Sequence, residues 1–128
     1  MNTQNWKDTL SLLCIMILAD EKVYQEEVES FQNAAVALRD ALNPKLMLTR
    51  HMAQEWFVVH KEELQQSISD HNKDKTVAGL LNNLRDLPER KELLVALMKI
   101  AMSDGHRHTS EVKIIERATQ TWELEIAS

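Results

Sequence analysis

The chain has 128 residues, of which 44% are apolar, and its 20 acidic and 15 basic side chains give a formal net charge of −5. This length is enough for one domain with a real hydrophobic core, and the ordinary apolar content excludes a disordered chain. The negative charge disfavours a nucleic-acid partner, because binding to a phosphate backbone requires a basic face. We therefore expect a single domain over residues 1–128.

The one cysteine, Cys14, lies within the apolar run Leu12–Ala19. A single cysteine excludes a disulfide within the chain, and the apolar neighbours predict a buried, inert thiol. The run is too short to span a bilayer, and the first residues lack the basic region and cleavage site of a signal peptide. These features predict a cytoplasmic protein with no direct membrane insertion.

Apolar side chains recur with a period near 3.6 along almost the whole chain, which has only two glycines and two prolines. Both features favour an all-α fold over a sheet. The pattern predicts helices at about residues 6–19, 25–40, 44–56, 61–69, 75–85, 88–103 and 110–122. The expected fold is therefore a compact bundle of six or seven helices.

Local signals define several of these helices. Because Leu12–Ala19 is apolar on every side, the first helix is predicted to be buried all round. Asn43 followed by Pro44 is typical of an N-cap and a first helical position. The stretch Val58–His60 is a weak helix former and predicts a break between the third and fourth helices.

Other residues in the second half of the chain carry weaker signals. The polar run 70–74 predicts a loop, and Gly79 within a helix predicts a close helix crossing. Trp56 and Trp122 are candidates for the core or for an interface. Five methionines are predicted to fill the core: Met16, Met47, Met52, Met98 and Met102.

A stretch of the chain occurs twice, at an offset of 84 positions. Residues 13–34 are LCIMILADEKVYQEEVESFQNA, and residues 97–118 are LMKIAMSDGHRHTSEVKIIERA. Each copy has an apolar helix, an Asp at its end, a polar turn and a Glu opening the next helix, with the spacing Asp-x6-Glu. This pattern predicts two pseudo-symmetric helix–turn–helix repeats, over about residues 6–40 and 88–124.

Four acids occupy the matched positions: Asp20 and Glu27 in the first copy, and Asp104 and Glu111 in the second. A carboxylate at a helix C-terminus is disfavoured by about 0.3–1 kcal/mol, so helix stability does not explain either aspartate. In one interpretation the acids brace the turns by accepting backbone hydrogen bonds. In the other the two turns converge, and the repelling carboxylates bind a hard cation, with Ca²⁺ or Mg²⁺ favoured.

The segments LADEKVYQEEV and AMSDGHRHTSEV resemble the paired A-D-G-x-[apolar]-x-x-x-E segments of TerB-like (tellurite-resistance protein B) domains. The resemblance implies a helical fold, bacterial origin, and a role in tellurite resistance or stress responses through protein partners. It also implies divalent-cation binding through Asp20, Glu27, Asp104 and Glu111. The first turn departs from the pattern at Glu21, where the family usually has Gly, and the second departs at Arg107, where the family has an apolar residue.

Histidines offer other candidate sites. His106 and His108 lie near Asp104 and suit Zn²⁺, which is a weaker candidate because turn histidines are more often exposed. Two His–Glu pairs have the spacing of helix-surface pairs: His51 with Glu55, and His60 with Glu63.

The sequence contains no Ser-His-Asp order, no glycine-rich phosphate loop and no dinucleotide fingerprint, so we expect a non-enzymatic protein. Two hypotheses follow. The first is a TerB-like cation-binding module linked to stress. The second is a protein-interaction or scaffold domain in which the repeated acids only brace their turns, and it predicts an exposed apolar patch. Both involve an unidentified protein partner.

Overall fold

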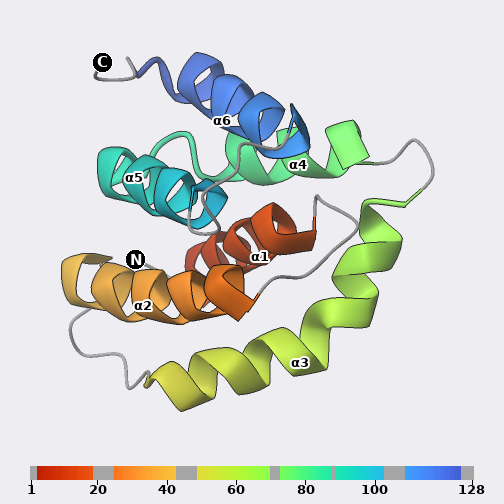
Figure 1. The fold of residues 1–128 in the computed structure, drawn as a ribbon. Coiled ribbons are helices and arrows are strands. Elements are labelled where there is room, and N and C mark those ends of the chain that lie inside the picture. The colour runs from red at the N-terminus through yellow and green to blue at the C-terminus, as the bar shows by residue number, and fades with distance from the viewer. Residues whose placement is uncertain are drawn as a thin grey trace.

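The computed structural model describes residues 3–18, 25–42, 49–69, 73–87, 89–102 and 109–124. Within these ranges the chain forms six α-helices and no strand (Figure 1). They are α1 (Thr3–Leu18), α2 (Gln25–Leu42), α3 (Arg50–Ser67), α4 (Lys73–Asn83), α5 (Arg90–Ala101) and α6 (Thr109–Trp122). The predicted all-α fold is confirmed.

Helix α1 lies at the centre and contacts α2, α3, α4 and α5. Every side chain from Leu10 to Leu18 is buried, as the uninterrupted apolar run predicts. A helix that is apolar on all sides loses no favourable hydration when other helices surround it. The apolar run therefore selects α1 as the element around which the others pack.

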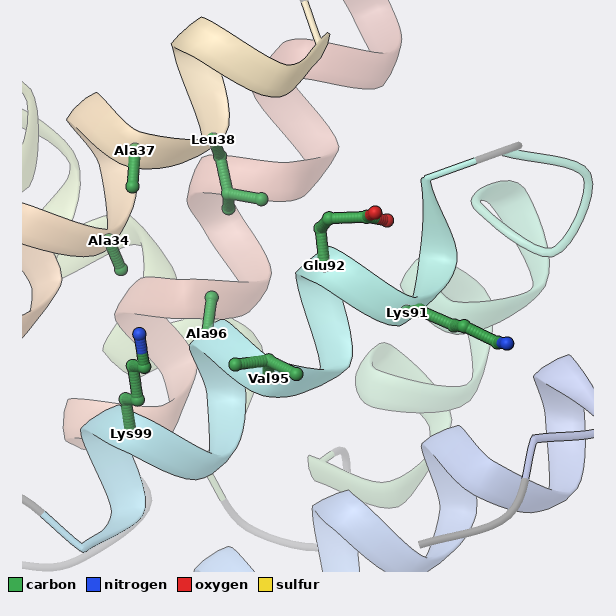
Figure 2. A pocket seen from close by; sticks show the side chains of 8 residues that line it. All are labelled: Ala34, Ala37, Leu38, Lys91, Glu92, Val95, Ala96 and Lys99. Atoms are coloured by element: carbon green, nitrogen blue, oxygen red, sulfur yellow. The ribbon is translucent and has the colours of Figure 1, made fainter. Parts of the chain in front are cut away.

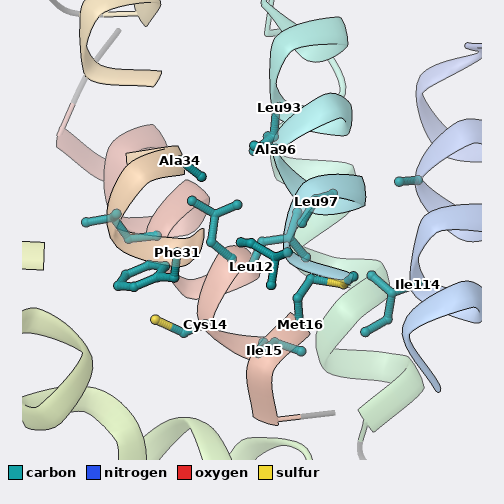
Figure 3. Close-up of a cluster of buried hydrophobic side chains, with 14 of the residues drawn as sticks. Leu12, Cys14, Ile15, Met16, Phe31, Ala34, Leu93, Ala96, Leu97 and Ile114 are labelled. Atoms are coloured by element: carbon teal, nitrogen blue, oxygen red, sulfur yellow. The ribbon is translucent and has the colours of Figure 1, made fainter. Parts of the chain in front are cut away.

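The surrounding helices bury one stripe each. Figure 3 shows Phe31 of α2, Leu97 of α5 and Ile114 of α6 grouped around Leu12 and Met16 of α1. The buried apolar residues form one cluster with members on all six helices. Phe31 also packs against Phe57 of α3, with ring centroids 6.0 Å apart, which adds an aromatic contact to the burial of apolar area.

Helix α3 is continuous through the predicted break at Val58–His60, so the third and fourth predicted helices are one. The weak propensity of the two valines is outweighed by tertiary packing, since Ala53 and Phe57 of this helix are buried in the core. Thr49 is the N-cap, and its hydroxyl accepts a 3.1 Å hydrogen bond from the Met52 backbone N–H. The predicted cap at Asn43 lies outside the described residues.

Two further predictions about packing are wrong. Gly79 does not lie at a close helix crossing, because a Cβ placed there would have no atom within 4 Å. Met52 and Met102 do not fill the core, since they are 43% and 52% exposed. Met16 is buried and Met98 packs partly buried against the core, as expected, while Met47 lies outside the described residues.

The structure shows where the two tryptophans lie that the sequence assigned to either the core or an interface. Trp122 is 2% exposed at the end of α6, and its indole N–H donates a 2.9 Å hydrogen bond to the backbone carbonyl of Leu81 in α4. Trp56 is half-buried and stacks on His60, with ring centroids 4.0 Å apart. The predicted loop over residues 70–74 is shorter than expected, because α4 already begins at Lys73.

Candidate functional site: the turns between the repeated helices

The two repeated turns join α1 to α2 and α5 to α6. Helices α2 and α6 begin at Gln25 and Thr109, which are 84 positions apart, the same offset as in the sequence repeat. In Figure 1 the last turns of α1 and α5 and the first turns of α2 and α6 lie on the same side of the bundle. The fold therefore places the helix ends that flank both turns at one end of the molecule.

The packing of α2 against α5 gives the same result. These helices are in direct contact and run antiparallel, with Ala34 beside Lys99 at one end and Leu38 nearer Glu92 at the other (Figure 2). The start of α2 and the end of α5 therefore lie on the same side of this helix pair (Figure 1). One repeated turn precedes α2 and the other follows α5, so these two helix ends flank the two turns.

The four predicted metal ligands have different places in this arrangement. Glu27 and Glu111 are each the third residue of their helices, α2 and α6, where the positive end of the helix dipole favours a carboxylate. Asp20 and Asp104 lie outside the described residues, as do the side chains of the two glutamates. The structure places the helices that carry the two glutamates, and convergence of the four carboxylates stays a prediction.

The remaining candidates take ordinary structural roles. Cys14 is fully buried in α1, and burial raises the pKa of its thiol because the charged form would lose its hydration. A thiol that stays protonated is a poor nucleophile, so the prediction of an inert core cysteine is supported. Within the described part of the chain, no three His, Cys, Asp or Glu side chains come together in a group able to hold a metal ion.

The candidate histidines have different surroundings. His51 and Glu55 form the expected helix-surface pair, with 2.9 Å between Nε2 and Oε1 on exposed side chains. His60 contacts Trp56 instead of Glu63, because its Nδ1 lies 2.8 Å from the Trp56 carbonyl oxygen and its ring stacks on the indole. His106 and His108 lie outside the described residues.

Two surface features were missed by sequence analysis. On α3, Val58 and Val59 are 65% and 73% exposed and line a hollow of about 340 Å³ with His51, Gln54 and Glu55. The weak helix propensity of these valines predicts a helix break, although a helix with two outward-facing valines fits the same sequence. The second feature is a groove of about 300 Å³ between α2 and α5. The groove forms where two helices pack side by side, and sequence periodicity does not predict which helices are neighbours.

The described helices form an all-α bundle, and the two repeated acidic segments of the sequence connect α1 to α2 and α5 to α6. The family model described as "Tellurite resistance protein TerB" matches residues 7–127, so the chain belongs to the TerB family. The comparisons with curated proteins and with solved structures gave no match. Among the described helices, none has the length and apolar character needed to cross a membrane.

Proposed function

We propose that this chain is a non-enzymatic TerB domain that binds a divalent cation, Ca²⁺ or Mg²⁺, in a process linked to tellurite resistance or stress in the cytoplasm. The ligands are the carboxylates of Asp20, Glu27, Asp104 and Glu111. The family match carries the proposal, because residues 7–127 include both Asp-x6-Glu turns.

The described helices are consistent with a shared site. The helix ends that flank both turns lie on the same side of the bundle, and each glutamate is the third residue of its helix, α2 or α6 (Figure 1). Oxygen ligands of this kind fit a hard cation and are poorly matched to softer transition metals, which prefer nitrogen and sulfur. A bound cation would supply the positive charge that allows several carboxylates to remain ionised together.

Calorimetric titration of the protein with Ca²⁺, Mg²⁺, Mn²⁺ and Zn²⁺ tests this proposal. We expect binding by the wild type and its loss in the double variant Asp20→Asn/Asp104→Asn, which removes two charges with little change of shape. Bound cation should also stabilise the fold, by about 2.7 kcal/mol at a free concentration of 100 times the dissociation constant.

The matched control is Glu62→Gln/Asp86→Asn, which removes two negative charges from exposed positions on α3 and after α4. This control should bind the cation as the wild type does. If the wild type binds none of the four ions, cation binding is wrong and the acids only brace their turns. Equal loss of binding in both double variants would point to a general charge effect and not to a site.

A second function, as a protein-interaction domain, is favoured by the exposed apolar side chains of α3. Met52, Val58 and Val59 expose 43%, 65% and 73% of their surfaces on one helix. Val58 and Val59 line one hollow, and exposed apolar patches are typical of interaction sites. We expect Val58→Glu/Val59→Glu to lose a partner that the wild type retains in affinity capture, with cation binding unchanged; retention of every partner by this variant would contradict the proposal.

A further inference from the structure

The groove between α2 and α5 has a floor of small side chains. Ala34 and Ala37 of α2 and Ala96 of α5 line it, and Leu38 closes one end (Figure 2). Val95 stands on its α5 edge and is 49% exposed, although its neighbours Leu94 and Ala96 are buried. The groove thus combines an apolar interior with an apolar side chain that has no place in the core of its own chain.

Lys91 and Glu92 lie at one end of the groove and Lys99 lies at the other, so Glu92 and Lys99 are opposite charges at opposite ends. Glu92 and Lys99 lie on the exposed face of α5 that carries Val95, at the spacing i, i+3 and i+7, which keeps side chains on one face. Seven residues of helix place the two charges about 10 Å apart along the axis, with Val95 between them. Figure 2 shows the Lys99 ammonium directed toward Ala34, and Lys91 directed away from Glu92.

Neither charge is neutralised within the described part of the chain. The ion pairs there join other residues, among them Arg39 with Asp40 and Arg117 with Asp74. Glu92 and Lys99 are both solvent-exposed. Glu92 at one end of this apolar groove and Lys99 at the other are complementary to the same two side chains of a second copy turned by 180°, because the Lys91 side chain is directed away from Glu92 (Figure 2).

The apolar hollow on α3 does not have this property. Its valines are followed by Glu62 and Glu63 and preceded by Glu55, all exposed. An antiparallel copy of α3 centred on the valines would place Glu55 opposite Glu62 or Glu63, and like charges at an interface disfavour association. Charge complementarity therefore distinguishes these two described surfaces, and of the two it is the α2–α5 groove that suits a second copy of the chain.

We propose that the α2–α5 groove is a self-association surface, in which two copies pack antiparallel about a two-fold axis beside Val95. Val95 of each copy enters the groove of the other, where the alanines leave room. Glu92 of one copy then pairs with Lys99 of the other, twice, as an isologous contact requires. A surface of this size gives a weak, concentration-dependent dimer, since stable interfaces bury well over 1,000 Å² in total (a typical value of about 1,600 Å²).

Sedimentation velocity of the full chain tests the proposal, at protein concentrations up to about 1 mM, the weak end of the affinity scale. Three proteins are compared: the wild type, Lys99→Glu and Glu92→Lys. Each single variant places like charges opposite each other at both contacts of a dimer, so we expect both to stay monomeric. Because both substituted positions are solvent-exposed, the fold should be retained, which far-UV circular dichroism checks.

An equimolar mixture of the two variants is the decisive experiment, because it tests whether opposite charges restore the dimer. In a mixed dimer Glu92 faces Lys99 at one contact, and the two introduced side chains, of opposite sign, face each other at the second. We expect the mixture to dimerise as the wild type does. The control Lys75→Glu makes the same charge change on exposed α4, away from the groove, and should dimerise normally.

Three results would overturn the proposal. The first is a wild type that stays monomeric up to about 1 mM, where even weak contacts associate. The second is normal dimerisation of either single variant, which would place the contact elsewhere. The third is failure of the mixture to dimerise when both single variants are folded, since charge complementarity would then not govern the contact.

Discussion

The hydrogen bond between Trp122 and the Leu81 carbonyl allows a quantitative prediction. Replacing Trp122 by Phe keeps an aromatic ring at this buried position but removes the N–H donor. The change affects the contact that joins the end of α6 to the last turn of α4, 41 residues earlier in the chain. It therefore measures how much one long-range tertiary contact contributes to the stability of the fold.

Two contributions set the magnitude. A net hydrogen bond between neutral groups contributes about 1 kcal/mol, and the Leu81 carbonyl is not left without a donor, because the Leu84 N–H also reaches it at 3.2 Å. The smaller ring removes on the order of 40 Å² of buried apolar area, worth about 1 kcal/mol. We expect Trp122→Phe to lower the free energy of unfolding by about 2 kcal/mol, and Trp122→Ala by about 3–5 kcal/mol.

Urea unfolding followed by far-UV circular dichroism measures this loss without relying on tryptophan fluorescence. A loss of about 2 kcal/mol should lower the urea midpoint by about 1 M at an unchanged slope. The matched control is Trp56→Phe, at a half-buried ring that stacks on His60, and it should cost less than half as much. The reasoning is refuted if Trp122→Phe costs no more than Trp56→Phe.

Three further predictions concern single positions. Gly79→Ala should raise the free energy of unfolding by about 0.5–1 kcal/mol in the same urea assay, because the position is helical and has open space for a Cβ. A lower free energy of unfolding would contradict the open space around this position. Thr49→Ala should cost about 1 kcal/mol by removing the cap of α3, whereas Thr49→Ser should cost little, and equal losses would exclude the cap. Burial raises the pKa of the Cys14 thiol, so the folded chain keeps a proton that the unfolded chain loses above its pKa of about 8.5. Stability should therefore be unaffected by this group below about pH 8.5 and fall above it, by at most about 1.4 kcal/mol per pH unit. Urea unfolding from pH 7.5 to 10 should show this extra slope in the wild type and not in Cys14→Ala; parallel curves would contradict it.

Much of the secondary structure follows from local sequence. The 3.6-residue period located α1, α2, α5 and α6 to within a few residues, because each buries an apolar stripe or, in α1, its whole circumference. The fixed offset of 84 residues also matched the starts of α2 and α6. These features depend on neighbours along the chain, which a sequence displays directly.

The errors arose where distant packing outweighs local preference. Val58 and Val59 favour a break locally, but the burial of Phe57 against Phe31 of α2 holds α3 together across them. Gly79 suggested a close crossing, and only the positions of the other helices show that it faces open space. Exposure depends on what lies opposite a residue, and the sequence does not contain that information.

The candidate cation site also has one part that the sequence shows and one part that only the tertiary structure shows. The sequence alone identified its acids, because Asp20, Glu27 and their counterparts recur at one spacing. It did not show that the helix ends flanking both turns lie on the same side of the bundle, which depends on α2 and α5 packing antiparallel. The groove between those helices is likewise a tertiary feature, since Ala34 and Val95 become neighbouring parts of one surface only after folding.

The sequence by itself thus determined the helical class, the buried central helix and the repeated acidic turns, since each is written in the spacing of residues along one segment. Tertiary structure decided the continuity of α3, the burial of Trp122 against Leu81, and the exposure of Val59 and Val95. Those outcomes depend on contacts between segments far apart in the chain, whose free energies exceed the small local preferences of single residues.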